Sequence, residues 1–149
     1  MYKHILLPVD GSETSLLAVA KAASLAKAFG AQVTAVYVLD PYPFAGGGPD
    51  FAFGQAQYMT AVNAEADEVL NTVKGRFAEQ GVEVNTKVVD AYSIWKGIVQ
   101  SADEVGADLI VMGSHGRKGV EKLMLGSVAQ RVVSHASRSV LIAHASCGR

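Results

Sequence analysis

Apolar residues recur along the chain in short runs that are separated by longer stretches with helical spacing. The runs cover residues 5–9, 33–39, 82–89, 109–112 and 140–143. Between them, apolar positions step by three and four, as at Val62, Ala66, Val69 and Val73. Strands that alternate with amphipathic helices are typical of a parallel sheet with crossover helices. The pattern therefore predicts one open α/β domain with five parallel strands and helices on both faces.

The third run differs from the other four, and this difference predicts its place in the sheet. Val82, Val84 and Val88 alternate with polar residues, whereas the other runs are almost entirely apolar. A solidly apolar strand is covered on both faces, while an alternating strand has one wet face. Together with right-handed crossovers, an edge position for the third strand gives the order 3-2-1-4-5. This order puts a topological switch point, where open α/β sheets bind ligands, between the first and fourth strands.

Glycines predict where the first three helices end. A helical stretch opens at Ser12 or Glu13 and closes at Gly30, a second closes at Gly81, and a third runs from Ser93 to Gly106. Glycine at these positions fits the left-handed residue that follows many helices. A fourth helix is expected over residues 127–135.

The stretch 40–57 interrupts this alternation. It contains three prolines, three consecutive glycines and three phenylalanines without a regular period. We predict a long loop there. It is either a lid or partner-binding flap, or a variable surface excursion whose aromatic side chains pack on the nearest helix, and we favour the second interpretation.

Charge and cysteine usage narrow the class of protein. The 13 Lys and Arg residues nearly balance the 14 Asp and Glu residues, which argues against general binding to nucleic acid or membrane lipid. Cys147 is the only cysteine, which fits a reducing compartment. The chain starts directly with a predicted strand and has no apolar segment of about 20 residues, so we expect neither a signal peptide nor a membrane span. These features predict a cytoplasmic protein.

The fourth predicted strand leads into a glycine-rich segment. Gly113, Gly116 and Gly119 follow Met112, and Gly126 precedes the fourth helix. Glycine lets phosphate oxygens approach the backbone, and a helix N-terminus adds free N–H groups with partial positive charge. This segment therefore predicts an anion-binding cradle.

Polar side chains near the cradle leave alternatives open. Ser127 either donates to a phosphate oxygen or caps the fourth helix, and both roles are compatible. Lys118 is one of the loop cations that either neutralise phosphate or remain solvated. His115 is a candidate proton donor, but no carboxylate stands beside it in sequence, and we favour a solvent-facing histidine. His4, His135 and His144 lack metal-ligand spacing.

Asp10 follows the first strand and so falls at the predicted switch point. Its functional role would be to accept a hydrogen bond from a ribose or adenine group, or to bind a phosphate-bound divalent cation. Alternatively, it is a turn aspartate that caps the first helix. The spacing alone does not separate these roles.

Two nucleotide fingerprints are absent, and a third pattern is present. The chain contains neither G-x-x-x-x-G-K-[ST] nor G-x-G-x-x-G after the first strand. It does contain Gly113-x2-Gly116-x9-Gly126-Ser127, together with the opening run at 5–12 and the run at 107–116. This combination resembles the ATP-binding branch of the universal stress protein family over essentially the whole chain, residues 1–149. The resemblance implies a Rossmann-like fold of the adenine nucleotide alpha hydrolase-like type.

The resemblance also implies a site. Adenine and ribose would lie near Val9, Asp10, Val38 and Met112, and phosphates near Gly113, Gly116, Gly126, Ser127 and Val128, while Pro8 and His115 complete the predicted set. The ligand would be ATP, ADP or AMP, with Mg²⁺ or Mn²⁺ held through Asp10. Where family members often have Cys-Pro before the last strand, this chain has Ser137-Arg138-Ser139.

The implied function is that of a nucleotide-dependent stress-response module that regulates a partner such as a transporter. The alternative is a slow ATPase or phosphotransferase with a divalent metal. We expect at most weak hydrolysis and assign no catalytic residue.

The last predicted strand suggests self-association. Val140, Leu141, Ile142 and Ala143 are all apolar, yet the strand falls at a sheet edge. Because an open apolar edge invites pairing, we expect a two-fold homodimer through this strand. The family resemblance points the same way.

Overall fold

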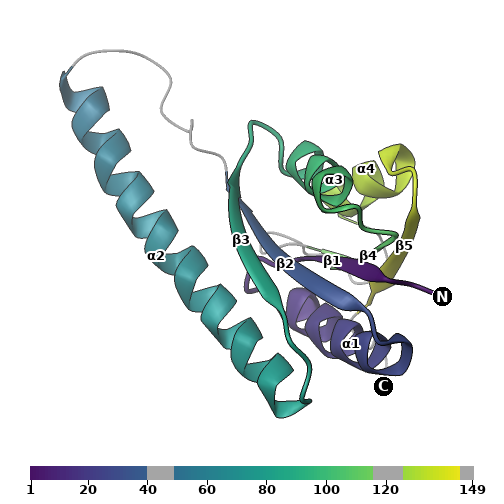
Figure 1. The fold of residues 1–149 in the computed structure, drawn as a ribbon. Coiled ribbons are helices and arrows are strands. Elements are labelled where there is room, and N and C mark those ends of the chain that lie inside the picture. The colour runs from purple at the N-terminus through teal and green to yellow at the C-terminus, as the bar shows by residue number, and fades with distance from the viewer. Residues whose placement is uncertain (40–48, 116–125, 145–149) are drawn as a thin grey trace.

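The computed structural model describes residues 1–39, 49–115 and 126–144. Within these ranges, strands and helices alternate along the chain (Figure 1). Their bounds are β1 (His4–Pro8), α1 (Glu13–Phe29), β2 (Gln32–Leu39), α2 (Pro49–Glu79), β3 (Asn85–Asp90), α3 (Ile94–Val105), β4 (Leu109–Gly113), α4 (Ser127–His135) and β5 (Ser139–Ala143).

The strands form one parallel sheet of five strands in the order β3-β2-β1-β4-β5. This topology confirms the fold class and the strand order predicted from the sequence. The alternating strand, β3, lies at one edge, and β5 lies at the other. The sheet order therefore puts the carboxyl ends of β1 and β4 side by side at the centre.

Two helices cover each face of the sheet. α1 and α2 lie on one face, and α3 and α4 lie on the other (Figure 1). The side chains of β1 alternate between the two layers: Ile5 and Leu7 join the core under α1 and α2, and Leu6 joins the core under α3 and α4. All three are fully buried. β1 therefore contributes to both cores, as its solidly apolar sequence predicts, and so do its neighbours β2 and β4.

The helix ends follow the predicted local chemistry. Ser12 is the N-cap of α1, where its side-chain oxygen accepts a hydrogen bond from the N–H of Ser15. Gly30, Gly81 and Gly106 have φ of 66°, 71° and 69°, so each adopts the left-handed conformation after its helix. These three helix ends are confirmed.

The predicted loop at 40–57 is wrong over its second half. Residues 49–57 belong to α2, while residues 40–48 lie outside the described ranges. Pro49 is compatible with this start because the first helical residue needs no N–H donor. α2 extends beyond the sheet at its N-terminal end (Figure 1). A helical turn outside the core needs no apolar period, which explains why the sequence pattern missed it.

The start of the third strand was also predicted too early. β3 begins at Asn85 and not at Val82. The N–H of Val82 instead donates to the carbonyl of Phe77, a bond that closes the end of α2. Val82 and Val84 still pack against the core, so their apolar alternation reflects burial before the strand pairs with β2.

Arg138 fixes the approach to β5. Its guanidinium donates to the backbone carbonyls of Ala102 and Ala107 at 2.8 and 2.7 Å and also pairs with Asp103. Arg138 thus ties the start of β5 to the end of α3. Over the part of the chain that the structure describes, no helix is both long and apolar enough to cross a membrane.

Candidate functional site

The pairing of β1 with β4 ends before its pairing with β2. β1 pairs with β4 at Ile5 and Leu6, whereas it pairs with β2 along its whole length as far as Pro8. Proline has no N–H, and the next N–H, on Val9, donates to Val36 of β2. Because backbone groups alternate along a strand, the missing donor of Pro8 is on the β4 side. Pro8 thus ends the β1–β4 ladder at the predicted switch point.

The turn between β1 and α1 is held by local hydrogen bonds. Gly11 has a φ of 81°, a left-handed conformation that lets the chain reverse into the helix. Asp10 Oδ1 accepts from the N–H of Ser12 at 2.9 Å, and the N–H of Asp10 donates to Ser15 Oγ at 3.2 Å. Asp10 is therefore a turn residue, but Ser12 and not Asp10 caps α1. The second carboxylate oxygen of Asp10 accepts no hydrogen bond from the described residues.

The end of β4 lies directly against the start of α1. A Cβ on Gly113 would lie 2.5 Å from Thr14 Oγ1 and 2.9 Å from the Ser15 nitrogen. Both distances are shorter than the contacts that Cβ atoms make in proteins. The Thr14 hydroxyl donates to the carbonyl of His115, and the Ser12 hydroxyl reaches the same carbonyl at 3.5 Å. Glycine is therefore required at 113 for space, which allows α1 to hold the segment after β4.

The N-terminus of α4 reaches the same segment. Gly126 is the N-cap of α4, and its N–H donates to the carbonyl of Ser114 at 2.7 Å. No side chain caps the helix, and Ser127 is its first residue. The interpretation of Ser127 as the N-cap is therefore wrong. The N–H groups of Ser127 and Val128 lie in the first turn, where a helix offers no internal acceptor. They are available to an anion.

His115 brings an unsatisfied nitrogen to this place. Its Nδ1 is hydrogen-bonded to Ser114 Oγ at 3.0 Å, while its Nε2 is buried without a partner among the described residues. A Cβ on Gly126 would lie 3.7 Å from Cδ2 of the same imidazole. A buried polar atom without a partner is costly. The expectation of a solvent-facing His115 is therefore corrected in part: the residue is half-buried, and its ring lies against the start of α4.

The residues predicted to hold adenine divide between the two faces of the sheet. Val38 and Met112 join the core under α3 and α4, whereas Val9 joins the core under α1 and α2. A Cβ on Gly97 would lie 2.7 Å from Val38 Cγ1, so α3 packs directly on the end of β2. Val38 stays half-buried and Met112 is 5% exposed. Among Val9, Val38 and Met112, Val38 is therefore the most exposed side chain.

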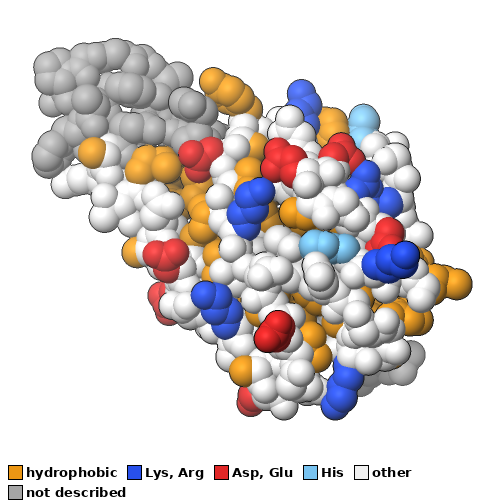
Figure 2. All heavy atoms as spheres, in the orientation of Figure 1, with side chains coloured by type: hydrophobic (Ala, Val, Ile, Leu, Met, Phe, Trp, Pro, Cys, Tyr) orange, Lys and Arg blue, Asp and Glu red, His pale blue; other side chains and the backbone are white. Residues whose placement is uncertain are grey.

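Part of the predicted site lies outside the described residues. This applies to Gly116 and to the loop cations Arg117, Lys118 and Lys122. Across the described ranges, no group of three His, Cys, Asp or Glu side chains is placed to hold a metal ion. On the face drawn in Figure 2, Lys and Arg side chains are interspersed with Asp and Glu.

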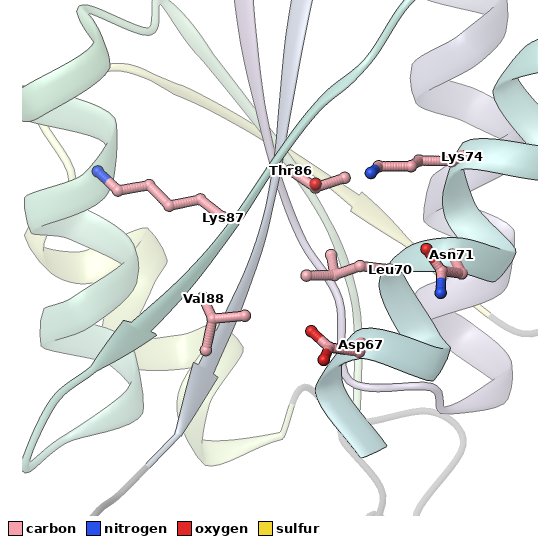
Figure 3. Close-up of a pocket in the computed structure, with 7 residues that line it drawn as sticks. All are labelled: Asp67, Leu70, Asn71, Lys74, Thr86, Lys87 and Val88. Atoms are coloured by element: carbon pink, nitrogen blue, oxygen red, sulfur yellow. The ribbon is translucent and has the colours of Figure 1, made fainter. Parts of the chain in front are cut away.

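A separate hollow of about 340 Å³ lies between α2 and β3 (Figure 3). It is lined by Asp67, Leu70, Asn71, Lys74, Thr86, Lys87 and Val88. Lys87 points away toward α3, where it pairs with Glu104 at 3.2 Å. The hollow borders an edge strand and not the switch point, and most of its polar side chains are exposed. It offers no concentrated anion cradle.

Sequence reasoning missed the hydroxyl groups that hold the site together. Thr14 and Ser114 are 8% and 0% exposed, which is unusual for polar residues. Thr14 is 101 positions from its partner His115, so no local pattern signals the contact. The only hint in the sequence was the position of Thr14, in the first turn of the helix that follows the first strand and so close to the predicted switch point.

Comparison with known proteins decides the family. The family model described as "Universal stress protein family" matches residues 1–144. This chain belongs to the universal stress protein family. The universal stress protein MJ0531 of Methanocaldococcus jannaschii is 39% identical over 142 residues, which cover 95% of this chain and 82% of that protein.

Solved universal stress proteins share the fold over nearly the whole chain. UspA from Lactobacillus plantarum matches with a TM-score of 0.85 and 26% identity, covering 96% of this chain and 98% of that one. A universal stress protein in complex with cAMP matches with a TM-score of 0.69 and 27% identity over 97% and 98% of the two chains. One from Archaeoglobus fulgidus in complex with dAMP matches with a TM-score of 0.67 and 26% identity over 95% and 97%.

Proposed function

We propose that this chain binds an adenine nucleotide, ATP in particular, at the carboxyl ends of β1 and β4. The observation that carries the proposal is that two features lie close together: the N-terminus of α4, which no side chain caps, and the buried Nε2 of His115, which has no partner among the described residues. Free N–H groups with partial positive charge bind phosphate, and an imidazole nitrogen supplies one further hydrogen bond. Universal stress proteins of the same fold have been solved with cAMP and dAMP, which supports an adenine nucleotide.

The described residues fit such a ligand. Phosphates would be held by Gly113, Gly126, Ser127 and Val128, with Gly116 of the loop. Glycine at 126 leaves the entrance to α4 without a Cβ, and the Ser127 side chain is exposed and available as a donor. Val9, Val38 and Met112 would border the base. These residues bind and orient the nucleotide, and none of them supplies a nucleophile.

Asp10 would contribute the acidic group of the site. One carboxylate oxygen is used by the turn to Ser12, and the other is available to a ribose hydroxyl or to Mg²⁺ or Mn²⁺ carried by the phosphates. This second oxygen, which has no partner among the described residues, is the observation that favours the second candidate function, slow phosphate hydrolysis with a divalent ion. Such an ion would neutralise phosphate charge. Turnover measured with and without Mg²⁺ separates this function from binding alone.

The proposed role is regulatory: the nucleotide-loaded and empty forms would present different surfaces to a partner such as a transporter. We place this role in the cytoplasm, in keeping with the single cysteine of the sequence.

We also propose a homodimer through β5. β5 is an edge strand in which Val140, Leu141 and Ile142 remain half-buried, so a second copy would cover apolar surface that the chain leaves partly open.

Mass spectrometry of protein purified without added nucleotide tests the proposal, followed by calorimetry with ATP, ADP, AMP and adenosine. We expect a co-purified adenine nucleotide or a binding isotherm for ATP. A protein that carries no nucleotide and gives no heat with any of the four ligands would refute nucleotide binding.

A further inference from the structure

The side chain of Thr14 holds both backbone groups of His115. Thr14 lies in the first turn of α1, and its hydroxyl donates to the His115 carbonyl. The N–H of His115 is directed back at the same oxygen, at 3.4 Å. Thr14 is only 8% exposed. A single buried hydroxyl therefore fixes the chain at the point where it leaves β4.

The peptide group between Ser114 and His115 contacts both Thr14 and the N-terminus of α4. Its N–H, from His115, is directed at Thr14, and its carbonyl, from Ser114, accepts from the N–H of Gly126 at 2.7 Å. A peptide group is a rigid plane, so rotation that breaks one of these bonds disturbs the other. Thr14 on α1 and Gly126 on α4 are thus connected through one plane, by a long contact of 3.4 Å on one side and a hydrogen bond of 2.7 Å on the other. The closer bond of Thr14, to the His115 carbonyl, fixes the peptide group that follows.

Neighbouring groups reinforce the connection without replacing Thr14. Gly113 lacks the Cβ that would otherwise meet the Thr14 hydroxyl at 2.5 Å, so the backbone approach is built around this side chain. The Ser12 hydroxyl lies 3.5 Å from the His115 carbonyl, a weak contact, and already caps α1. Removal of the Thr14 hydroxyl would therefore leave the His115 carbonyl poorly satisfied.

We infer that Thr14 is a positioning residue of the nucleotide site, which acts through the Ser114–His115 peptide to set the N-terminus of α4 against His115. This inference rests on the proposed function. Thr14 would influence the phosphate end of the site, because Gly126 and His115 are the residues that it positions. The base, expected near Val9 and Val38, lies outside this connection. Thr14 therefore adds to affinity for phosphate and not for adenosine.

Two substitutions separate the hydroxyl from the shape of the side chain. Thr14→Val keeps the branched shape and removes the hydrogen bond, whereas Thr14→Ser keeps the hydroxyl and removes a methyl group. Calorimetry with ATP and with adenosine is the first measurement. We expect Thr14→Val to bind ATP about tenfold more weakly, to bind adenosine within about twofold of wild type, and Thr14→Ser to restore ATP binding.

Three calorimetric results would overturn the inference. They are an unchanged ATP affinity in Thr14→Val, an equal loss for ATP and adenosine, and a loss in Thr14→Ser as large as in Thr14→Val. The last two would mean that the side chain only supports the fold.

Amide hydrogen exchange in the protein without added ligand tests the positioning independently of nucleotide. We expect the Gly126 amide to exchange about tenfold faster in Thr14→Val, while the Ala136 amide at the other end of α4 keeps its rate. Unchanged Gly126 exchange, or an equal rise at both amides, contradicts positioning by Thr14. If wild type binds neither ATP nor adenosine, the proposed function is wrong, and the Gly126 exchange rate still decides whether Thr14 fixes α4.

Discussion

His4 and Asp108 bind each other in both directions across the start of the central strands. The N–H of His4 donates to Asp108 Oδ1 at 3.1 Å, and the N–H of Asp108 donates to the His4 carbonyl at 3.0 Å. The N–H of Lys3 also donates to the same carboxylate, at 2.9 Å to Oδ2. Desolvation of the Asp108 carboxyl raises its pKa, but the hydrogen bonds from Lys3 and His4 outweigh this effect, and the pKa lies below its usual value.

This lowered pKa predicts a pH-dependent contribution to stability. A carboxyl with a lowered pKa in the folded state stabilises the fold fully above its unfolded pKa, and the contribution is lost as the pH falls through the folded pKa. We expect Asp108→Asn to be less stable than wild type near neutral pH, with the difference shrinking as the pH falls below about 4, the usual pKa of an aspartate. Urea unfolding across this range measures the difference. A gap that does not change with pH would show that the charge of Asp108 contributes nothing.

Gly113 predicts a steric requirement for a small residue. We expect Gly113→Ala to lower the free energy of unfolding by about 1–3 kcal/mol, because the new Cβ would overlap the backbone of Thr14 and Ser15. Gly75→Ala is the matched control, since a Cβ there meets nothing within 4 Å and alanine favours a helix. Chemical denaturation of both variants and wild type measures these free energies of unfolding. Equal stabilities for the two variants would mean that α1 and β4 are not in close contact.

Gly126 predicts a loss of ligand binding that leaves the fold intact. Its φ of −66° and ψ of 163° suit any residue, so valine is accommodated by the backbone, although its Cβ would lie 3.1 Å from the Ser114 carbonyl. We expect Gly126→Val to abolish ATP binding because its methyl groups fill the space before α4. Circular dichroism checks the fold, and calorimetry checks the binding. Normal affinity for ATP in this variant would place the phosphate site elsewhere.

Ser127→Ala provides a graded comparison with Gly126→Val. It removes one exposed hydroxyl and leaves the N–H groups of α4 in place, so we expect a loss in ATP binding of about 1 kcal/mol, or about fivefold. Calorimetry with ATP measures it. An effect as large as that of Gly126→Val would mean that the side chain, and not the backbone, dominates phosphate binding.

Ile142 allows the proposed β5 interface to be tested without disturbing the sheet. The Ala143 carbonyl accepts from Ser114 on the β4 side, so the backbone groups of Ile142 face the free edge. Ile142→Pro removes an outward N–H, whereas Ile142→Ala removes a comparable part of the side chain and keeps the N–H. By light scattering, we expect wild type and Ile142→Ala at twice the chain mass and Ile142→Pro shifted toward monomer. A monomeric wild type, or a dimeric proline variant, would exclude pairing through β5.

The sequence predicts the fold well because its local signals agree with its tertiary packing. Solid apolar runs mark the buried strands, and Gly30, Gly81 and Gly106 mark helix ends whose backbone needs a left-handed residue. The start of α2 was missed because the first turns of a helix beyond the sheet need no apolar period. Prediction from pattern alone is therefore sound where packing imposes a period and fails where it does not.

The candidate site was predictable only in part. Gly113 and Gly126 are adjacent to a strand end and a helix start, which makes them visible as a local motif. The contacts of Thr14 depend on the crossover connections that bring α1 beside the end of β4. The buried state of His115 Nε2 depends in the same way on where the chain returns in space. Such features follow from topology and leave no mark in local spacing.

The connection between Thr14 and His115 has a consequence for how the domain folds. It joins residues 101 positions apart, so it forms only after most of the chain has closed into the sheet. Contacts of such large sequence separation carry a high loop-closure entropy and typically form late in folding. A nascent chain that has not yet reached β4 would contain α1 with its threonine but no competent site. Ligand binding would thus distinguish completed molecules from partly folded ones, and nucleotide added during refolding would trap the finished domain.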